Sequence, residues 1–329
     1  MARVAVIGAG SWGTAISVSL ARGGHNVVLR SRTTEAAEEL SRSGENKKYL
    51  PGVKLPEGIE HTADAACVEG AELIVMATPS HTMRDMAKLI APYVKEKQII
   101  VSISKGFDEA IGQRLSEVIA EEIPSARVAA MSGPSHAEEV ALSMPTTNVV
   151  ASDDAEAALR VQEIFNSPSF RIYTSEDIIG VELGGSLKNV IALCAGICDG
   201  LGYGDNAKAA LITRGIAEIT RLGVAMGAKF ETFAGLSGIG DLVATCTSMH
   251  SRNRRAGILI GSGKSPAEAE AEVKMVVEGV KSASAVYALA QKYGVEMPIS
   301  REAYRVLYEG ADVRECLPRL MGRDTKPEV

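Results

Sequence analysis

The sequence lacks an excess of basic residues, which argues against one broad class of function. Its 329 residues include 35 Lys and Arg against 41 Asp and Glu, for a net charge of -6. Proteins that bind nucleic acid generally present a basic face to the phosphates, so we expect no nucleic-acid partner. The hydrophobic content of 46% is ample for buried cores, so the chain is not expected to be disordered.

Cysteine is scarce and is not arranged as a metal site. None of the five cysteines forms a C-x-x-C pair, and Cys194 and Cys198 lie four residues apart in an apolar helical stripe. No set of His or acidic ligands is evident around them, so we expect packing and no metal ion. An odd, scattered set of cysteines is typical of reduced thiols in a cytoplasmic protein.

Uninterrupted hydrophobic runs are missing from the first part of the chain. Residues 4–21 carry no charge, but three glycines interrupt them and four Ser or Thr residues dilute them. We therefore expect neither a signal peptide nor a membrane span there, and no membrane insertion. Long-period repeats and low-complexity segments are also missing, and the length suits about two domains.

What the sequence does contain is a series of short apolar segments alternating with helical patterns. Strands are predicted at 3–7, 26–31, 72–78, 98–104, 127–132, 147–152 and 170–175. Helices are predicted at 11–22, 80–91, 112–122 and 153–165. This alternation predicts an α/β domain with a doubly wound, mainly parallel sheet of the Rossmann type.

The pattern changes after about residue 180. Apolar residues recur at helical spacing over 187–201, 206–226, 266–292 and 300–308, and no convincing strand appears. We therefore predict a dinucleotide-binding domain at 1–180 and an all-α substrate and catalytic domain at 181–329.

A glycine-rich turn follows the first predicted strand. Gly8, Gly10 and Gly13 fit the G-x-G-x-x-G pattern and open a helix. The first glycine permits a tight turn, the second lets the backbone approach a pyrophosphate, and the third lets helix and strand pack closely. The helix N-terminus favours an anion, so the pattern predicts a dinucleotide cofactor.

The residues at the end of the second predicted strand indicate which cofactor is bound. Enzymes that use NAD usually place Asp or Glu there, whereas this sequence has Arg30-Ser31-Arg32. A guanidinium can bind a 2′-phosphate in a bidentate manner, which favours NADPH or NADP over NADH or NAD. Arg32 is the stronger candidate, and the alternative is that both arginines are solvated surface residues.

Two further candidates follow predicted strands. Lys105 ends the strand at 98–104, and strand ends of this kind face the ligand crevice; the alternative is an ordinary exposed lysine. Ser135 and Glu138 fit an S-x-x-E capping box, at a helix start that also suits an anion. We discount His136 as a catalytic base because no acidic partner is identifiable.

Lys188 is predicted near the start of the first helix of the second domain, on the face away from the apolar stripe. There the helix dipole and partial burial would lower the lysine pKa toward a range useful for acid–base catalysis. Asp241, after a glycine-rich segment, could orient Lys188 or a substrate hydroxyl; the alternatives are a solvated lysine and a helix-capping aspartate.

A basic stretch at 250–257 contains Arg252, Arg254 and Arg255 in an otherwise net-acidic chain. Arg252 with Asn253 could hold a phosphate, and a solvated basic helix face is the alternative. The segment Gly261–Ser265 is similar to a P-loop but lacks its first glycine, since position 258 is Ile. Ser265-Pro266 is better interpreted as a helix N-cap and first helical residue.

Taken in order, these motifs resemble those of bacterial NAD(P)-dependent glycerol-3-phosphate dehydrogenases over nearly the whole chain. The similar segments are "GAGSWGTA", "NKKYLPG", "SISKGF", "SGPSHAEEV", "ELGGSLKNVIALCAGICDGLGYGDNAKAALITRG", "GLSGIGDLVATCTS", "SRNRRAG" and "VVEGV". The resemblance implies reversible reduction of dihydroxyacetone phosphate to sn-glycerol 3-phosphate, for phospholipid synthesis, by a cytoplasmic enzyme expected to be a homodimer.

The same resemblance implies roles for individual residues. Lys188 is implied as the general acid/base, supported by Lys105 and Asp241. The implied cofactor contacts are Gly8, Gly10, Ser11, Trp12, Gly13, Arg32, Tyr49, Lys105, Ala137, Arg252, Val276 and Glu278. The implied substrate contacts are Lys105, Gly133, Ser135, Lys188, Asp241, Ser251, Arg252 and Asn253. The alternatives are a related β-hydroxyacid dehydrogenase and an NADPH-sensing protein without turnover.

Overall fold

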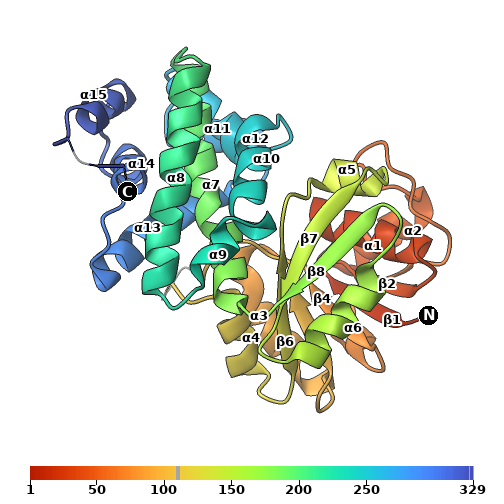
Figure 1. Cartoon of the computed structure of the whole chain (residues 1–329). Coiled ribbons are helices and arrows are strands. Elements are labelled where there is room, and N and C mark those ends of the chain that lie inside the picture. The colour runs from red at the N-terminus through yellow and green to blue at the C-terminus, as the bar shows by residue number, and fades with distance from the viewer. Residues whose placement is uncertain (109–111, 326, 329) are drawn as a thin grey trace. The chain divides into compact units, whose positions relative to one another are not determined.

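The computed structural model describes residues 1–108, 112–325, 327 and 328. It contains one eight-stranded sheet with the strand order β3-β2-β1-β4-β5-β6-β7-β8 (Figure 1). The strands are β1 Arg3–Ile7, β2 Asn26–Arg30, β3 Glu60–Thr62, β4 Leu73–Met76, β5 Ile99–Ser102, β6 Arg127–Ser132, β7 Thr146–Ala151 and β8 Phe170–Ser175. Every neighbouring pair is parallel except β6 with β7. The predicted doubly wound, mainly parallel sheet is thus confirmed.

Helices cover both faces of this sheet because successive residues of its buried strands are apolar, so that both faces are hydrophobic. One face packs against α1 Ser11–Arg22, α5 Ala137–Ala141 and α6 Ala155–Phe165, and the other against α3 Met83–Ile90 and α4 Leu115–Glu122. In β1, for example, Val4 and Val6 join the first core cluster, whereas Ala5 and Ile7 join the second. The helix α2 Thr34–Ser43 follows β2 and precedes the edge strand β3.

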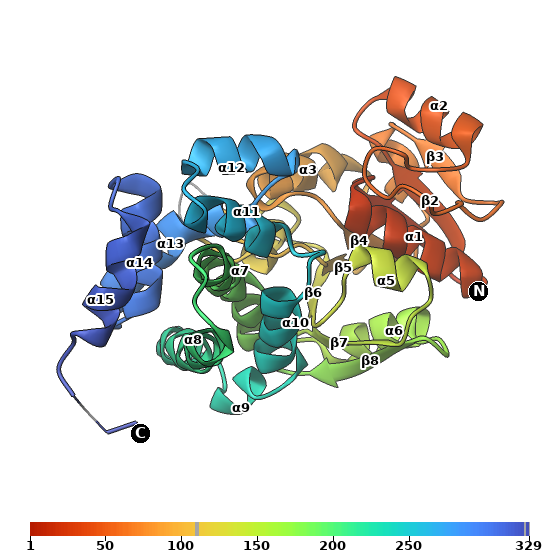
Figure 2. The ribbon, with the colours of Figure 1, turned by 90° about the horizontal axis from the view of Figure 1, so that it is seen from above.

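The rest of the described chain is helical, as predicted for the second half. Its helices are α7 Ile178–Gly200, α8 Asp205–Ala225, α9 Phe230–Phe233, α10 Asp241–Thr247, α11 Arg252–Gly261, α12 Pro266–Val273, α13 Glu278–Tyr293, α14 Pro298–Tyr308 and α15 Cys316–Met321. Figures 1 and 2 show α7 and α8 running side by side. Gly215 permits this approach, because a Cβ there would lie 2.5 Å from Cγ2 of Ile191.

The chain forms two compact units that differ from the predicted single division after residue 180. The first unit comprises Met1–Ser186 and Gly227–Asp241, and the second comprises Leu187–Met226 and Leu242–Val329. Asp177 explains why 227–241 joins the first unit: its carboxylate accepts hydrogen bonds from the Lys229 amide at 2.9 Å and the Thr232 hydroxyl at 2.6 Å. Sequence periodicity carries no signal for such a long-range connection.

Two local predictions were wrong. The predicted helix over 266–292 is two helices, because Lys274 adopts a left-handed conformation, with φ 57°, that ends α12. The short edge strand β3 was not predicted, since its three residues are too few for a clear alternating pattern. Ser265 does cap α12 as expected, with Pro266 at the first helical position.

One described helix, α7, is long and apolar enough to cross a membrane by length and composition, but 89% of its apolar window is buried inside the protein. Such burial is typical of a core helix in a soluble protein. Cys194 and Cys198 lie on this helix, and burial raises the pKa of both thiols. All five cysteines are free, as predicted.

Candidate functional site

The three glycines of the first turn occupy three different environments, each matching a distinct requirement of dinucleotide binding. Gly8 has φ 116°, and a Cβ there would lie 2.7 Å from the Ala77 carbonyl oxygen. A Cβ on Gly13 would lie 1.9 Å from the Gly8 carbonyl oxygen, whereas a Cβ on Gly10 would meet nothing within 4 Å. The turn is therefore tight at Gly8, closely packed at Gly13 and open at Gly10, as a pyrophosphate cradle requires.

The open side of this turn is the N-terminus of α1, which begins at Ser11 and has no acidic residue in its first turn. Unsatisfied backbone N–H groups at such a terminus favour an anion. The turn is held from the other side by Asn46, which donates to the Ala9 carbonyl at 3.0 Å and to the Thr14 hydroxyl at 2.8 Å. The sequence did not reveal this role of Asn46, because the two turn residues that it contacts lie more than 30 positions earlier in the chain.

The end of β2 also suits a polar ligand, although its two arginines differ from expectation in their surroundings. Arg32 is exposed, whereas Arg30 is 7% exposed and places Nη1 3.7 Å from Sδ of Met86. The buried Arg30 Nε and Ser31 Oγ atoms have no hydrogen-bond partner within the protein. Buried polar atoms usually have partners, so this edge of the sheet fits the ribose and adenine end of a dinucleotide.

Lys105 and Asp241, predicted from separate motifs, form an ion pair in the first unit. The Lys105 Nζ atom lies 2.7 Å from Oδ2 of Asp241 and donates to the Gly133 carbonyl at 3.0 Å. Asp241 is 2% exposed and also accepts from the Ser132 hydroxyl at 3.4 Å. The aspartate therefore orients Lys105, a partner that the sequence did not suggest.

Gly133 and Ser135 lie directly after β6, at the carboxyl edge of the sheet. Gly133 has φ 148°, and a Cβ there would lie 2.5 Å from Oδ1 of Asn148. The predicted capping box was wrong: α5 begins at Ala137 with His136 as its N-cap, and the Ser135 hydroxyl donates to the Gly133 carbonyl at 3.0 Å. Ser135 therefore shapes the turn, and α5 spans only 5 residues.

Lys188 lies in the second unit and is 4% exposed. Its Nζ donates to the Thr245 hydroxyl at 2.6 Å. The expected position near a helix N-terminus was wrong, because α7 begins at Ile178, ten residues earlier. The macrodipole acts mainly within the first turn, so the helix-dipole argument does not apply to Lys188. Thr245 was missed, although it lies one helical turn after Asp241 on α10.

The predicted phosphate residues begin the helix α11. Ser251 is its N-cap, and its hydroxyl accepts from the Arg254 amide at 3.2 Å. The buried Asn253 side chain donates to Oδ1 of Asn189 at 2.9 Å and accepts from the Gly279 amide at 2.9 Å. Gly279 directly follows Glu278, which like Val276 is a predicted cofactor contact. The Asn253 side chain, a predicted substrate contact, therefore binds the backbone beside that part of the predicted cofactor site.

Arg254 has a different environment from its neighbours in the basic stretch. Its guanidinium lies 2.8 Å from Oδ2 of Asp199 and donates to the Thr247 carbonyl at 2.9 Å. Lys208 also lies 2.5 Å from Asp199. Arg254 is thus part of a structural ion-pair network, rather than a free member of a phosphate-binding cluster.

The remaining predicted cofactor residues occupy ordinary positions in their own units. Trp12 is partly buried against the core of the first unit, Ala137 is buried, and the Tyr49 ring has the Lys48 ammonium 5.0 Å from its centre. Val276 and Glu278 are partly exposed at the start of α13. These residues are placed by the structure, but their cofactor contacts stay predictions.

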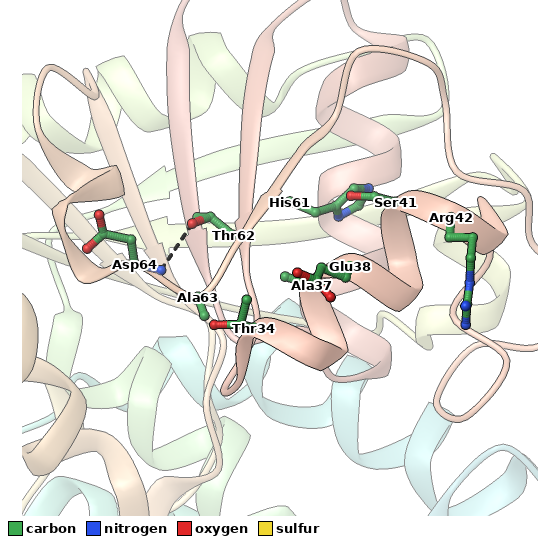
Figure 3. Close-up of a pocket in the computed structure, with 9 residues that line it drawn as sticks. All are labelled: Thr34, Ala37, Glu38, Ser41, Arg42, His61, Thr62, Ala63 and Asp64. Atoms are coloured by element: carbon green, nitrogen blue, oxygen red, sulfur yellow. Dashed lines mark hydrogen bonds between the residues drawn. The ribbon is translucent and has the colours of Figure 1, made fainter.

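A surface pocket between α2 and β3 lies beside the end of β2, where the Ser31 amide donates to the Thr62 carbonyl at 2.7 Å. Figure 3 shows its lining, which includes His61, Thr62 and Asp64 but none of the predicted cofactor or substrate residues. The dashed line marks the Asp64 amide donating to the Thr62 hydroxyl at 3.0 Å. Within the described residues, no group of three or more His, Cys, Asp or Glu side chains is arranged to hold a metal ion.

Comparison with known proteins finds the same family over both parts of the chain. Family models described as the N-terminus and the C-terminus of NAD-dependent glycerol-3-phosphate dehydrogenase match residues 3–158 and 177–318. The chain is 52% identical to glycerol-3-phosphate dehydrogenase [NAD(P)+] of Desulfitobacterium hafniense, over 100% of this chain and 94% of the relative. It is 55% identical to the Moorella thermoacetica protein of that name, over 99% and 97%.

A solved structure extends the similarity to three dimensions. The crystal structure of glycerol-3-phosphate dehydrogenase from Coxiella burnetii superposes with a TM-score of 0.94 at 39% sequence identity. The match covers 98% of this chain and 99% of that one. The agreement of sequence and fold therefore extends over both compact units.

Proposed function

The chain belongs to the glycerol-3-phosphate dehydrogenase family, and on that premise we propose which of its residues carry out the reaction. The protein is an NAD(P)-dependent oxidoreductase that acts on the CH–OH group of sn-glycerol 3-phosphate. The reverse direction reduces dihydroxyacetone phosphate. Since sn-glycerol 3-phosphate is the backbone of glycerophospholipids, the reaction supplies their synthesis.

The single observation that supports the residue assignment best is the burial of Lys188. Lysine is rarely buried this fully, and this one is 4% exposed with its ammonium 2.6 Å from the Thr245 hydroxyl. Buried ionisable groups cluster at functional sites. We therefore assign Lys188 as the group that exchanges a proton with the substrate oxygen.

This assignment requires one hydride transfer and one proton transfer. The bound nicotinamide supplies the hydride that reaches C2 of dihydroxyacetone phosphate. As the C2 carbonyl becomes an alkoxide, the Lys188 ammonium gives its proton to that oxygen, and the C2 hydroxyl forms. In the oxidative direction the neutral amine of Lys188 takes this proton back. Lys105, fixed by Asp241, adds positive charge near the developing oxyanion.

The substrate phosphate is assigned to Ser251, Arg252 and Asn253, with Gly133 and Ser135 lining the site. Asn253 uses one amide N–H for Asn189, so its second N–H can donate to a phosphate oxygen. The Arg252 guanidinium supplies charge-assisted hydrogen bonds. Holding the remote phosphate fixes the carbonyl relative to the hydride donor, which reduces the entropic part of the barrier.

For the cofactor, we assign the pyrophosphate to Gly8, Gly10, Ser11, Trp12 and Gly13. The further contacts are assigned to Arg32, Tyr49, Lys105, Ala137, Arg252, Val276 and Glu278. We assign NADPH as the preferred cofactor because the end of β2 has Arg30-Ser31-Arg32 in place of the acidic residue typical of NAD enzymes. Arg30, buried at the same strand end, is a second candidate for that contact.

The cellular setting follows from the same assignment. We propose a cytoplasmic homodimer that binds only small-molecule substrates and cofactors, without nucleic-acid binding or membrane insertion. The net charge of -6 supports the exclusion of nucleic acid.

The test is to mix purified protein with dihydroxyacetone phosphate and follow nicotinamide absorbance, using NADPH and NADH in parallel. We expect faster oxidation of NADPH than of NADH. Equal rates would retain the reaction but contradict the preference assigned from the β2 end. Protein that binds NADPH without oxidising it would be a sensor, and activity on a β-hydroxyacid without phosphate would identify a different dehydrogenase.

A further inference from the structure

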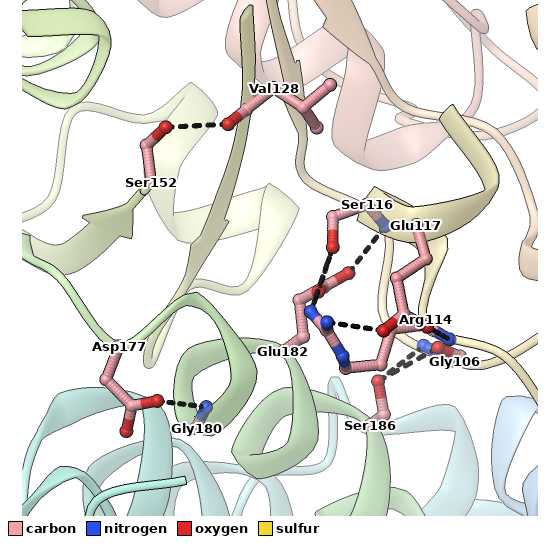
Figure 4. A network of polar contacts seen from close by, with 10 residues as sticks. All are labelled: Gly106, Arg114, Ser116, Glu117, Val128, Ser152, Asp177, Gly180, Glu182 and Ser186. Atoms are coloured by element: carbon pink, nitrogen blue, oxygen red, sulfur yellow. Dashed lines mark hydrogen bonds and ion pairs between the residues drawn. The ribbon is translucent and has the colours of Figure 1, made fainter. Parts of the chain in front are cut away.

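Two polar residues on one face of α7 hold the backbone that follows β5. Glu182 and Ser186 are four residues apart, so they lie one helical turn from each other on the same face. Figure 4 shows both side chains directed toward the segment that contains Gly106, Arg114 and Ser116. Neither α7 residue belongs to the substrate or cofactor set assigned above.

The Ser186 hydroxyl makes two hydrogen bonds with a single residue of this segment. It accepts from the Gly106 amide at 2.9 Å and donates to the Gly106 carbonyl at 3.0 Å. Ser186 is 2% exposed, so water does not compete for these groups. One buried hydroxyl therefore fixes both polar groups of the residue that directly follows Lys105.

Glu182 holds the residues at the start of α4. Its carboxylate lies 2.7 Å from Nη1 of Arg114 and accepts from the Ser116 amide at 2.8 Å, and the Ser116 hydroxyl also donates to it. The Ser116 amide is one of the N–H groups at the start of α4 that lack an intrahelical partner. Glu182 therefore caps α4 from a distant part of the chain.

The backbone of α7 also approaches the Lys105 side chain closely at Gly185. A Cβ on Gly185 would lie 2.3 Å from the Ser132 hydroxyl oxygen and 3.5 Å from Cγ of Lys105. The far end of the same lysine is held by Asp241 at 2.7 Å and by the Gly133 carbonyl at 3.0 Å. Ser186 thus holds Gly106, the residue after Lys105, and Asp241 and Gly133 hold the Lys105 ammonium.

Gly106 needs the restraint that Ser186 provides. Gly106 has φ 156° and no side chain to anchor it. Glycine loses more conformational freedom on ordering than any other residue, so an unrestrained Gly106 would let the Cα of Lys105 move. A displacement of about 1 Å at a group that orients substrate can reduce turnover by about a hundredfold.

We propose that Ser186 is a positioning residue for the dehydrogenase reaction, which fixes Gly106 and through it the ammonium of Lys105, while Glu182 holds Arg114 and Ser116 at the start of α4. This inference rests on the role proposed above for Lys105. Substitution of an ordinary buried serine lowers stability alone, whereas substitution of Ser186 is expected to lower kcat as well.

The test compares Ser186→Ala with Ser152→Ala. Ser152 is also a buried serine of the first unit, and its hydroxyl donates to the Val128 carbonyl at 2.7 Å, away from Gly106 (Figure 4). Both variants lose a hydroxyl with a comparable partner, so thermal unfolding should report similar losses of stability. We expect Ser186→Ala to lower kcat about tenfold and Ser152→Ala to leave kcat unchanged.

A double-mutant cycle then tests the connection to Lys105. If Ser186 acts through Lys105, Ser186→Ala should have no further effect on kcat in a Lys105→Met background. Equal kcat values for Ser186→Ala and Ser152→Ala would overturn the inference, and so would full additivity with Lys105→Met. If Lys105→Met leaves no measurable turnover, the comparison of the two serine variants decides.

Different experimental results would refute the proposed function itself. An inactive wild-type protein would refute the dehydrogenase assignment, and a fully active Lys105→Met variant would refute the role of Lys105. An active wild type, a defective Lys105→Met variant and a fully active Ser186→Ala variant together would refute only the positioning role of Ser186.

Discussion

Substituting two glycines of the first turn with alanine should separate cofactor binding from folding. Gly10 and Gly13 belong to one motif, but their surroundings are opposite. A Cβ at Gly10 would meet no atom within 4 Å, and the residue has an ordinary φ of -75°. A Cβ at Gly13 would lie 1.9 Å from the Gly8 carbonyl oxygen and 3.1 Å from the Ala77 Cβ.

These contacts set the expected changes in the free energy of unfolding without cofactor. For Gly10→Ala, a poorer N-cap costs about 0.5–1 kcal/mol, and the stiffer unfolded chain offsets about 0.4–1 kcal/mol, so the net change is small. For Gly13→Ala, α1 would have to move about 1.5 Å to reach an ordinary nonbonded distance. Such overpacking costs about 1–3 kcal/mol or more.

Binding of NADPH should respond differently. A methyl group at Gly10 occupies the open side of the turn, where the backbone must approach a pyrophosphate. We expect Gly10→Ala to unfold within about 4 °C of wild type and to bind NADPH at least about a hundredfold more weakly. Gly13→Ala should lose both stability and binding.

The assays are thermal unfolding without cofactor and calorimetric titration with NADPH. Wild-type NADPH affinity in Gly10→Ala would refute the assignment of this turn as the pyrophosphate site. Equal destabilisation by the two substitutions would refute the packing argument, even if both variants failed to bind cofactor.

Three further predictions follow from other parts of the structure. Lys188→Ala should abolish turnover while NADPH binding, measured by titration, survives; loss of binding in a folded variant would contradict its role as proton donor. Arg252→Ala should raise the apparent KM for dihydroxyacetone phosphate by roughly 10- to 100-fold, as expected for a lost charge-assisted contact, and an unchanged KM would exclude it as the phosphate anchor. Burial raises the pKa of Glu218 to about 7 from 4.5, so its stabilising contribution is complete below pH 4.5 and declines as the pH rises through 7. Relative to Glu218→Gln, the wild type should lose about 3 kcal/mol of unfolding free energy over that interval, and parallel urea titrations with the same pH dependence would refute this.

The parts of the fold that could be predicted from the sequence are those governed by local patterns. β1, the turn at Gly8 and α1 follow from an apolar run, a glycine pattern and helical periodicity in the first 22 residues. Ser265 was likewise recognised as a cap because Pro266 follows it, and its hydroxyl accepts from the Glu268 amide three residues away. In each case the interactions that decide the structure lie within a few residues of each other.

The errors arose where a local pattern competed with a contact from a distant part of the chain. Ser135 and Glu138 have capping-box spacing, but the Ser135 hydroxyl bonds the Gly133 carbonyl, and Asn148 donates to the same hydroxyl at 3.3 Å. Lys188 was placed near a helix start because it was assigned to the first helix of a domain predicted to begin near residue 181, although two glycines at 184 and 185 precede it. The helix continues through those glycines, since their missing side chains permit close packing rather than a turn.

The segment "GGSLK" of α7 shows why a shared motif does not by itself identify catalytic residues. A Cβ on Gly184 would lie 2.3 Å from the Ser237 carbonyl oxygen, and one on Gly185 would lie 2.3 Å from the Ser132 hydroxyl oxygen. Ser186 binds both polar groups of Gly106, and Lys188 follows two residues later. Packing thus requires both glycines, whereas we propose that the serine is required for positioning and the lysine for chemistry. Substitution of any of the four would reduce activity, so only assays that separate folding, cofactor binding and turnover can distinguish their roles.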